Sequence, residues 1–190
     1  TIFETDLFAN FINIIPGGVP NKVRRLVADH MRATAFLISD GVIPSNKGVG
    51  YVLRRLMRRA IVHADQLGIN LLEILGVIVK EYKNFYPELN NNLVQEEFEK
   101  EQERFQKTLK IGYREFKKME IVNAITAFKL YETYGLPFET LKDFGGKRTE
   151  NLTREDFDIE FKKHQEKSRA GAGKKFGGHG LILDTGELKA

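Results

Sequence analysis

The chain has 190 residues, enough for one large or two small domains, and its 42% hydrophobic and 29% charged residues are typical of a soluble globular protein. It has no cysteine, which excludes disulfides and thiolate metal sites and fits a reducing, cytoplasmic location. No run approaches the roughly 20 apolar residues of a membrane span, so we expect no membrane partner. Since the chain starts with Thr1 and not methionine, we expect a piece of a longer protein.

The positive charge is concentrated near the beginning of the chain. The formal net charge is +4, and residues 1–70 hold nine Lys and Arg against five Asp and Glu, so they account for the whole excess. Seven of these nine bases are arginine, whose forked guanidinium suits phosphate oxygens. This distribution predicts a polyanionic partner.

Helical periodicity recurs along the chain, whereas the alternation typical of strands is almost absent. The first strongly periodic segment follows Pro20 and predicts a helix that Asn21 caps and Asp40-Gly41 ends. The next helix is predicted over residues 50–67, with Gly68 as its C-terminal cap. We therefore predict an all-α fold.

Two further helices are predicted in the middle of the chain. One covers residues 71–86, with Asn70 as its cap and Pro87 at its end. The other is a long charged helix over residues 93–122, on the order of 45 Å at 1.5 Å per residue. Its apolar positions have nearly coiled-coil spacing and predict a buried seam of Phe98, Phe105, Leu109, Gly112, Phe116 and Met119.

The last helices lead into a glycine-rich tail. A short helix is predicted over residues 127–134, ending at Gly135, and a final one over 153–170, with Thr153 as its cap. Residues 171–190 are predicted to be a linker or the start of the next domain.

These elements predict one helical domain over residues 1–170. We expect a basic subdomain over residues 1–88, followed by the long helix and a second subdomain over 89–170. A helix of such length commonly bridges two subdomains.

The segment PSNKGVGYVLRRLMRRA, residues 44–60, carries the densest charge. Arg54 and Arg58 lie one helical turn apart, as do Arg55 and Arg59, and like charges at this spacing repel by a few tenths of a kcal/mol per pair. Carboxylates from neighbouring elements could neutralise them, or a phosphate backbone could bind them. Lys47 in the loop and Arg24, Arg25 and Arg32 on the preceding helix are candidates to extend a basic face.

Three blocks carry a family resemblance. RRLVADHMRATAFLISDGVIPSNKGVGYVLRRLMRRAIVHADQLG, residues 24–68, resembles the middle helical segment of alanyl-tRNA synthetases. ETDLF at 4–8 and AFKLYETYGLPFE at 127–139 are similar to two further blocks of that family, in the same order. The resemblance implies a segment that follows the class II catalytic core and precedes the editing domain.

The resemblance implies a function for this segment within an alanine–tRNA ligase. The parent enzyme would use ATP and Mg, with Zn in its editing domain, whereas this piece would hold no cofactor and would be catalytically inactive. Its expected partners are the acceptor stem of alanine tRNA and the catalytic and editing domains of the same parent chain.

Members of that family read a G·U wobble pair in the acceptor stem with an Asn and an Asp. By motif the Asn falls on Asn46, and the acid falls on Glu132, one methylene longer than the usual Asp. The resemblance also implies that Arg54, Arg55, Arg58 and Arg59 contact acceptor-stem phosphates and riboses. From the residues alone, Asn46 is equally a helix cap or a loop-ordering side chain, and Glu132 a surface charge.

Other functions remain open at this point. The arginine helix could lie in the major groove of DNA as part of a helix-turn-helix, or it could dock the catalytic domain in a structural spacer. Asp29 and His30 do not predict a metal site, because adjacent helical residues point in different directions and no second ligand is near the histidine. A stand-alone enzyme is the least supported, because no nucleophile, base or ligand set is present.

Overall fold

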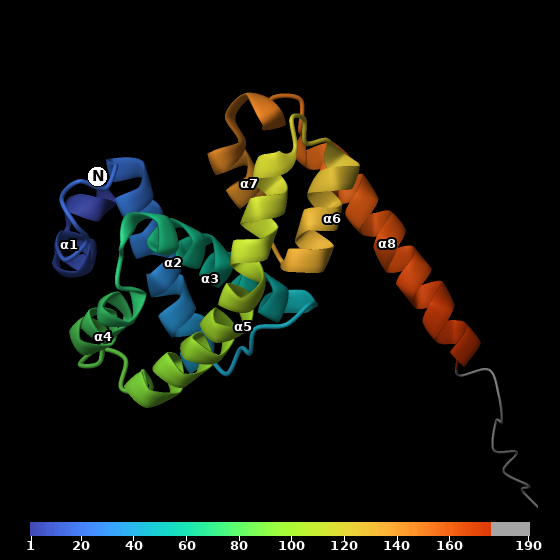
Figure 1. Ribbon diagram of the computed structural model, residues 1–190. Helices are drawn as coiled ribbons and strands as arrows, with labels where there is room; N and C mark the ends of the chain where they lie inside the picture. Colours follow the sequence, from blue (N-terminus) through green and yellow to red (C-terminus); the bar gives the residue numbers. More distant parts are fainter. Residues whose placement is uncertain (176–190) are drawn as a thin grey trace, which may run out of the picture.

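The computed structural model describes residues 1–175, and this part of the chain consists of helices and their connections (Figure 1), which confirms the all-α prediction. In chain order the helices are η1 (Ile2–Glu4), α1 (Asp6–Asn13), α2 (Asn21–Ser39), α3 (Gly48–Leu67), α4 (Leu71–Tyr82), α5 (Asn91–Lys118), α6 (Ala124–Tyr134), α7 (Phe138–Gly145), η2 (Gly146–Thr149) and α8 (Arg154–Lys175). None of the helices within residues 1–175 combines the length and apolar character needed to cross a lipid bilayer.

α5 connects two groups of helices (Figure 1). Along its first half it packs on α2, α3 and α4, and further along it packs on α6. α7 contacts both α3 and α6, and α8 packs on α6 before projecting away from the other helices. The expected subdomain boundary at residue 88 falls in the connection between α4 and α5, and the division itself stays a prediction.

Several helix ends follow the local signals in the sequence. Gly68 and Gly135 end α3 and α6 in the left-handed conformation, with φ of 66° and 73°, as predicted. The Asn70 side chain accepts a hydrogen bond from the Glu73 backbone N–H, and Thr153 Oγ1 accepts one from that of Asp156 at 3.1 Å. These caps are confirmed.

Other boundaries differ from prediction. Asn21 is the first residue of α2 and makes no capping hydrogen bond, because Pro20 occupies the cap position. α4 ends at Tyr82, four residues early, and α5 ends at Lys118, where Met119 turns to extended backbone. α8 continues to Lys175, so the linker predicted from residue 171 begins inside a helix. Its remainder, residues 176–190, lies outside the described residues.

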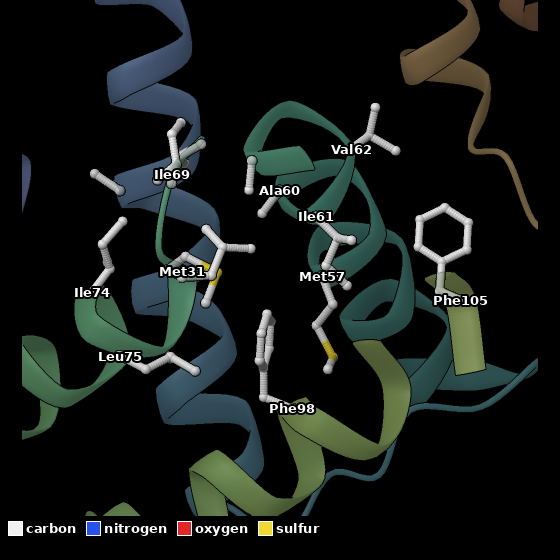
Figure 2. Close-up of a cluster of buried hydrophobic side chains, with 14 of the residues drawn as sticks. Met31, Met57, Ala60, Ile61, Val62, Ile69, Ile74, Leu75, Phe98 and Phe105 are labelled. Atoms are coloured by element: carbon white, nitrogen blue, oxygen red, sulfur yellow. The ribbon is translucent and has the colours of Figure 1, made fainter. Parts of the chain in front are cut away.

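The core is continuous across both groups of helices. Figure 2 shows side chains of α2, α3, α4 and α5 converging, with Met31, Met57 and Phe98 fully buried at the centre. Each such side chain contributes about 1.5–3 kcal/mol relative to an exposed position. The predicted seam on α5 is buried from Phe98 to Phe116, whereas Met119 lies beyond the helix and is partly buried.

Gly112 fixes how closely α5 and α6 approach. A Cβ atom added there would lie 2.7 Å from Cβ of Tyr134, far inside normal contact distance. The missing side chain therefore lets α6 pack directly on α5.

Candidate nucleic-acid interface

An open groove of about 830 Å³ lies between α3, α5, α6 and α8. Asn46 and Glu132, which come from blocks far apart in the sequence, both line it. The basic side chains along the groove are Lys47, Arg54, Arg55, Arg58 and Arg104, and its aromatic ones include Tyr51, Phe128, Tyr131 and Phe161. The groove thus combines two polar side chains suited to base edges with cations suited to phosphates.

Asn46 is oriented by the arginine helix. Arg54 Nη1 donates to Asn46 Oδ1, and Arg54 Nη2 donates to the Pro44 carbonyl at 3.0 Å. Asn46 is not the cap of α3, because Lys47 occupies that position. Since Arg54 occupies the amide oxygen of Asn46, the amide N–H groups remain available to a ligand.

A buried carboxylate neutralises part of the positive charge on α3. Glu101 of α5 is only 2% exposed, and its Oε1 accepts a hydrogen bond of 2.7 Å from Arg58 Nε. Arg54 Nε lies 3.3 Å from the same oxygen, as an ion pair without hydrogen-bond geometry. Arg58 also donates to the Gly135 carbonyl, and its guanidinium lies 4.8 Å from the centre of the Phe105 ring. These contacts join α3, α5 and the end of α6.

The other two arginines of the helix pair with carboxylates of α7. Arg59 donates to Asp143 Oδ2 through Nε and Nη2, at 3.1 and 2.8 Å, and Arg55 Nη1 lies 3.6 Å from Glu139 Oε1. Burial by itself would raise the pKa of Asp143, but hydrogen bonds from His63 and Arg59 outweigh it and hold that pKa below its ordinary value. Neighbouring carboxylates therefore resolve the repulsion between the four arginines, the first of the two explanations that the sequence offered.

The arginines divide according to where they point. Arg54, Arg55 and Arg58 line the groove, whereas Arg59 faces α7. The three expected on the preceding helix lie elsewhere and fasten η1, α1 and α4 to α2: Arg24 donates to the Ile12 carbonyl, Arg25 pairs with Glu4, and Arg32 donates to the Tyr82 hydroxyl. The structure does not bring these three to the groove.

Two groove residues were missed from the sequence. Arg104 extends from α5, where it stands among alternating charges that gave no reason to single it out. His164 extends from α8, and its Nε2 lies 2.6 Å from Glu132 Oε1. No spacing pattern connects positions 132 and 164, because their proximity depends on how α8 packs on α6.

A second hollow, of about 930 Å³, lies on the opposite side of α5. Tyr113 lines this hollow, whereas Arg104 lines the groove. The two residues are nine positions apart, which is two and a half helical turns, so their side chains lie on opposite faces of α5. The basic side chains of the hollow are Lys110, Arg114, Lys117, Lys118 and Arg148. None of the residues expected from the sequence to bind RNA lines this hollow. Its cations can therefore be substituted as controls for the cations of the groove.

Comparison with known proteins decides the family. Residues 1–184 match the family described as tRNA synthetases class II (A). This chain belongs to that family. The similarity to alanyl-tRNA synthetases seen in the three sequence blocks is thereby confirmed.

Curated relatives carry the name alanine–tRNA ligase. That of Ruegeria sp. (strain TM1040) is 38% identical over 188 residues, which is 89% of this chain and 21% of the relative. That of Thermotoga sp. (strain RQ2) is 39% identical over 189 residues, 90% and 22% of the two chains. That of Borrelia hermsii (strain HS1 / DAH) is 38% identical over 201 residues, which is 94% of this chain and 34% of the relative. The chain thus spans between a fifth and a third of these synthetases.

Across residues 1–175, His, Asp and Glu side chains form no group of three or more that could hold a metal ion. Asp29 and His30 do contact each other, at 3.2 Å, although adjacent helical residues were expected to point apart. Burial lowers the pKa of His30 despite this hydrogen bond. The pair is a local contact between an exposed carboxylate and a largely buried imidazole on α2.

Proposed function

We propose that this chain is the segment of an alanine–tRNA ligase that binds the acceptor stem of alanine tRNA and reads its G·U pair. The observation that carries the proposal is the groove in which Asn46 and Glu132 lie together among cations. The catalytic and editing domains of the same parent would be its other partners, in the cytoplasm. ATP, Mg and Zn would be bound by those domains, and this segment alone would be inactive.

The chemistry of the two polar side chains suits a wobble pair. The accessible edge of A-form RNA is its wide, shallow minor groove, where the 2-amino group of a wobbled guanine is poorly paired. The free oxygen of Glu132 can accept from that amino group, and the amide N–H of Asn46 can donate to an acceptor beside it. Arg54 contacts only the amide oxygen of Asn46, and His164 contacts only one oxygen of Glu132, so the amide N–H groups and the second carboxylate oxygen stay available.

The backbone contacts are assigned to the cations along the groove. Lys47 and Arg104 are exposed, line the groove and pair with no carboxylate of the described residues, so we expect them to bind phosphates first. Arg54, Arg55 and Arg58 would add to this field while remaining tied to their carboxylates. Cations of this kind set position, and the two polar side chains set specificity.

Specific contacts also favour a bracing function for the arginine helix. All four of its arginine side chains pair with acids of α5 or α7 and are between 18% and 31% exposed. α3 packs on α2, α4, α5 and α7 and leaves no long free face, which disfavours insertion into a DNA major groove. Bracing and RNA binding are compatible, because different atoms of the same side chains would serve them.

The test is binding of the chain to an acceptor-stem hairpin with G·U beside the same hairpin with G·C. Asn46→Ala and Glu132→Gln should each lower the G·U preference, Glu132→Gln by about tenfold, since a hydrogen bond to a charged group contributes about 1.5–3 kcal/mol. Asn92→Ala and Glu99→Gln, exposed on α5 and outside the groove, are the matched controls. Equal binding of the two hairpins by the unmodified chain would refute base-pair reading.

A further inference from the structure

We infer that His164 is a positioning residue that orients the Glu132 carboxylate and thereby sets how strongly the groove discriminates between base pairs. The inference rests on the proposed function and adds a residue from α8 to it. Its basis is the 2.6 Å contact between His164 Nε2 and Glu132 Oε1 inside the groove.

Glu132 needs such an orienting partner. Its side chain is 47% exposed, and His164 is the only partner with which it forms an ion pair or hydrogen bond among the described residues. A glutamate loses up to about 1.5–2 kcal/mol of rotamer entropy when it is ordered. Without a fixed orientation, this cost would fall on the RNA-binding step and would weaken the contact that reads the base pair.

His164 is itself held in place. Its ring lies 5.3 Å from the ring of Phe128, at an interplanar angle of 47°, and Phe128 lies one turn before Glu132 on α6. α8 packs on α6 along this stretch. The imidazole, although 48% exposed, therefore packs against the same helix whose carboxylate it contacts.

The contact leaves the reading function intact. A carboxylate offers two oxygens and about four acceptor positions, and His164 occupies one of them. His164 Nε2 approaches Oε1 at 2.6 Å without hydrogen-bond geometry, and the second oxygen forms no ion pair or hydrogen bond with the described residues. Because this contact restrains one oxygen, the orientation of the other is restricted before RNA arrives.

A double-mutant cycle tests the inference. We expect His164→Ala to lower the ratio of G·U to G·C affinity about 3- to 10-fold while leaving G·C binding and the salt dependence unchanged. His164→Gln, which keeps an N–H donor, should retain most of the preference. In the Glu132→Gln background, His164→Ala should change the ratio less than about twofold. Asn92→Ala, exposed on α5 and outside the groove, is the control.

Three outcomes would overturn the inference. His164→Ala could leave the ratio unchanged, lower the affinity for both hairpins equally, or act as strongly with Glu132→Gln as without it. A circular dichroism melt of each variant separates these from loss of fold.

Failure of the proposed function is distinguishable from failure of this inference. If the unmodified chain does not distinguish the hairpins, base-pair reading fails, but the His164–Glu132 contact is still measurable in the free protein. In ring ¹⁵N spectra the Nε2 signal of His164 should differ between the unmodified chain and Glu132→Gln. An Nε2 signal that Glu132→Gln does not change would refute the positioning contact whatever the RNA data show.

Discussion

Replacing Glu101 by glutamine should destabilise the fold strongly although the side-chain volume barely changes. Glu101 is 2% exposed and is the shared partner of Arg54 and Arg58, whose side chains are 19% and 18% exposed. Glutamine keeps one acceptor oxygen but removes the charge, so two largely buried guanidinium groups lose their counter-ion.

The magnitude follows from the contacts that remain. Breaking a buried ion pair costs about 3–5 kcal/mol, and a hydrogen bond to a charged group contributes about 1.5–3 kcal/mol. Arg58 retains the Gly135 carbonyl at 3.3 Å and the Phe105 ring, and both arginines keep some contact with water. We therefore expect Glu101→Gln to lower the free energy of unfolding by about 2–4 kcal/mol.

The assay is urea denaturation followed by circular dichroism, with a thermal melt beside it. At this chain length 1 kcal/mol shifts Tm by roughly 2–4 °C, so a loss of about 3 kcal/mol predicts a decrease of about 6–12 °C. Glu103→Gln, exposed on the same helix, is the control. If both variants unfold at the same urea concentration, the bracing argument is refuted and apolar packing alone holds α3 on α5.

Three further predictions concern packing, pH and RNA binding. Gly112→Ala should cost about 1–3 kcal/mol in denaturant titrations, because its Cβ meets α6 at 2.7 Å, whereas Gly76→Ala, with its nearest neighbour at 3.9 Å, should be neutral or stabilising. The pKa of Asp143 is lower in the folded than in the unfolded chain, so its carboxylate stabilises the fold at pH values above the unfolded pKa. This stabilisation is lost as the pH falls through the folded pKa. Asp143→Asn should therefore be less stable near neutral pH and lose less stability on acidification, measured by urea midpoints at about pH 7 and about pH 3. Arg104→Ala should reduce the salt slope of RNA binding by about 0.7–0.9, whereas Arg148→Ala in the second hollow should leave the slope unchanged. An equal reduction by both variants would mean that net charge alone drives binding.

Local chemistry made much of the fold predictable. Glycine in the left-handed region and asparagine or threonine beside an apolar stripe act within one or two turns, so Gly68, Asn70 and Thr153 were identified correctly. α7 was not predicted, because it has only eight residues and is held by contacts with α3, α6 and η2. The early end of α4 leaves Phe85 80% exposed, which apolar periodicity does not anticipate.

The candidate site was only partly predictable. Asn46 and Glu132 were found through resemblance, and their presence in one groove depends on how α6 packs on α5. The acids that pair with the arginines could not be identified from spacing, with one exception. Glu101 stands three residues after Phe98 and four before Phe105, at a position where the seam requires a buried side chain. A carboxylate on an apolar stripe indicates a buried cation elsewhere in the fold.

Arg54 contacts the groove and the interior at the same time. Its guanidinium binds the Asn46 oxygen and the Pro44 carbonyl at one end, and its Nε lies beside the Glu101 carboxylate at the other. A substitution that loosens the α3–α5 contact would therefore also free the amide of Asn46 to rotate. If the proposed function holds, the preference for G·U would then decline at temperatures where the helices are still intact, so a screen for variants with reduced G·U preference would recover positions on α5 outside the groove.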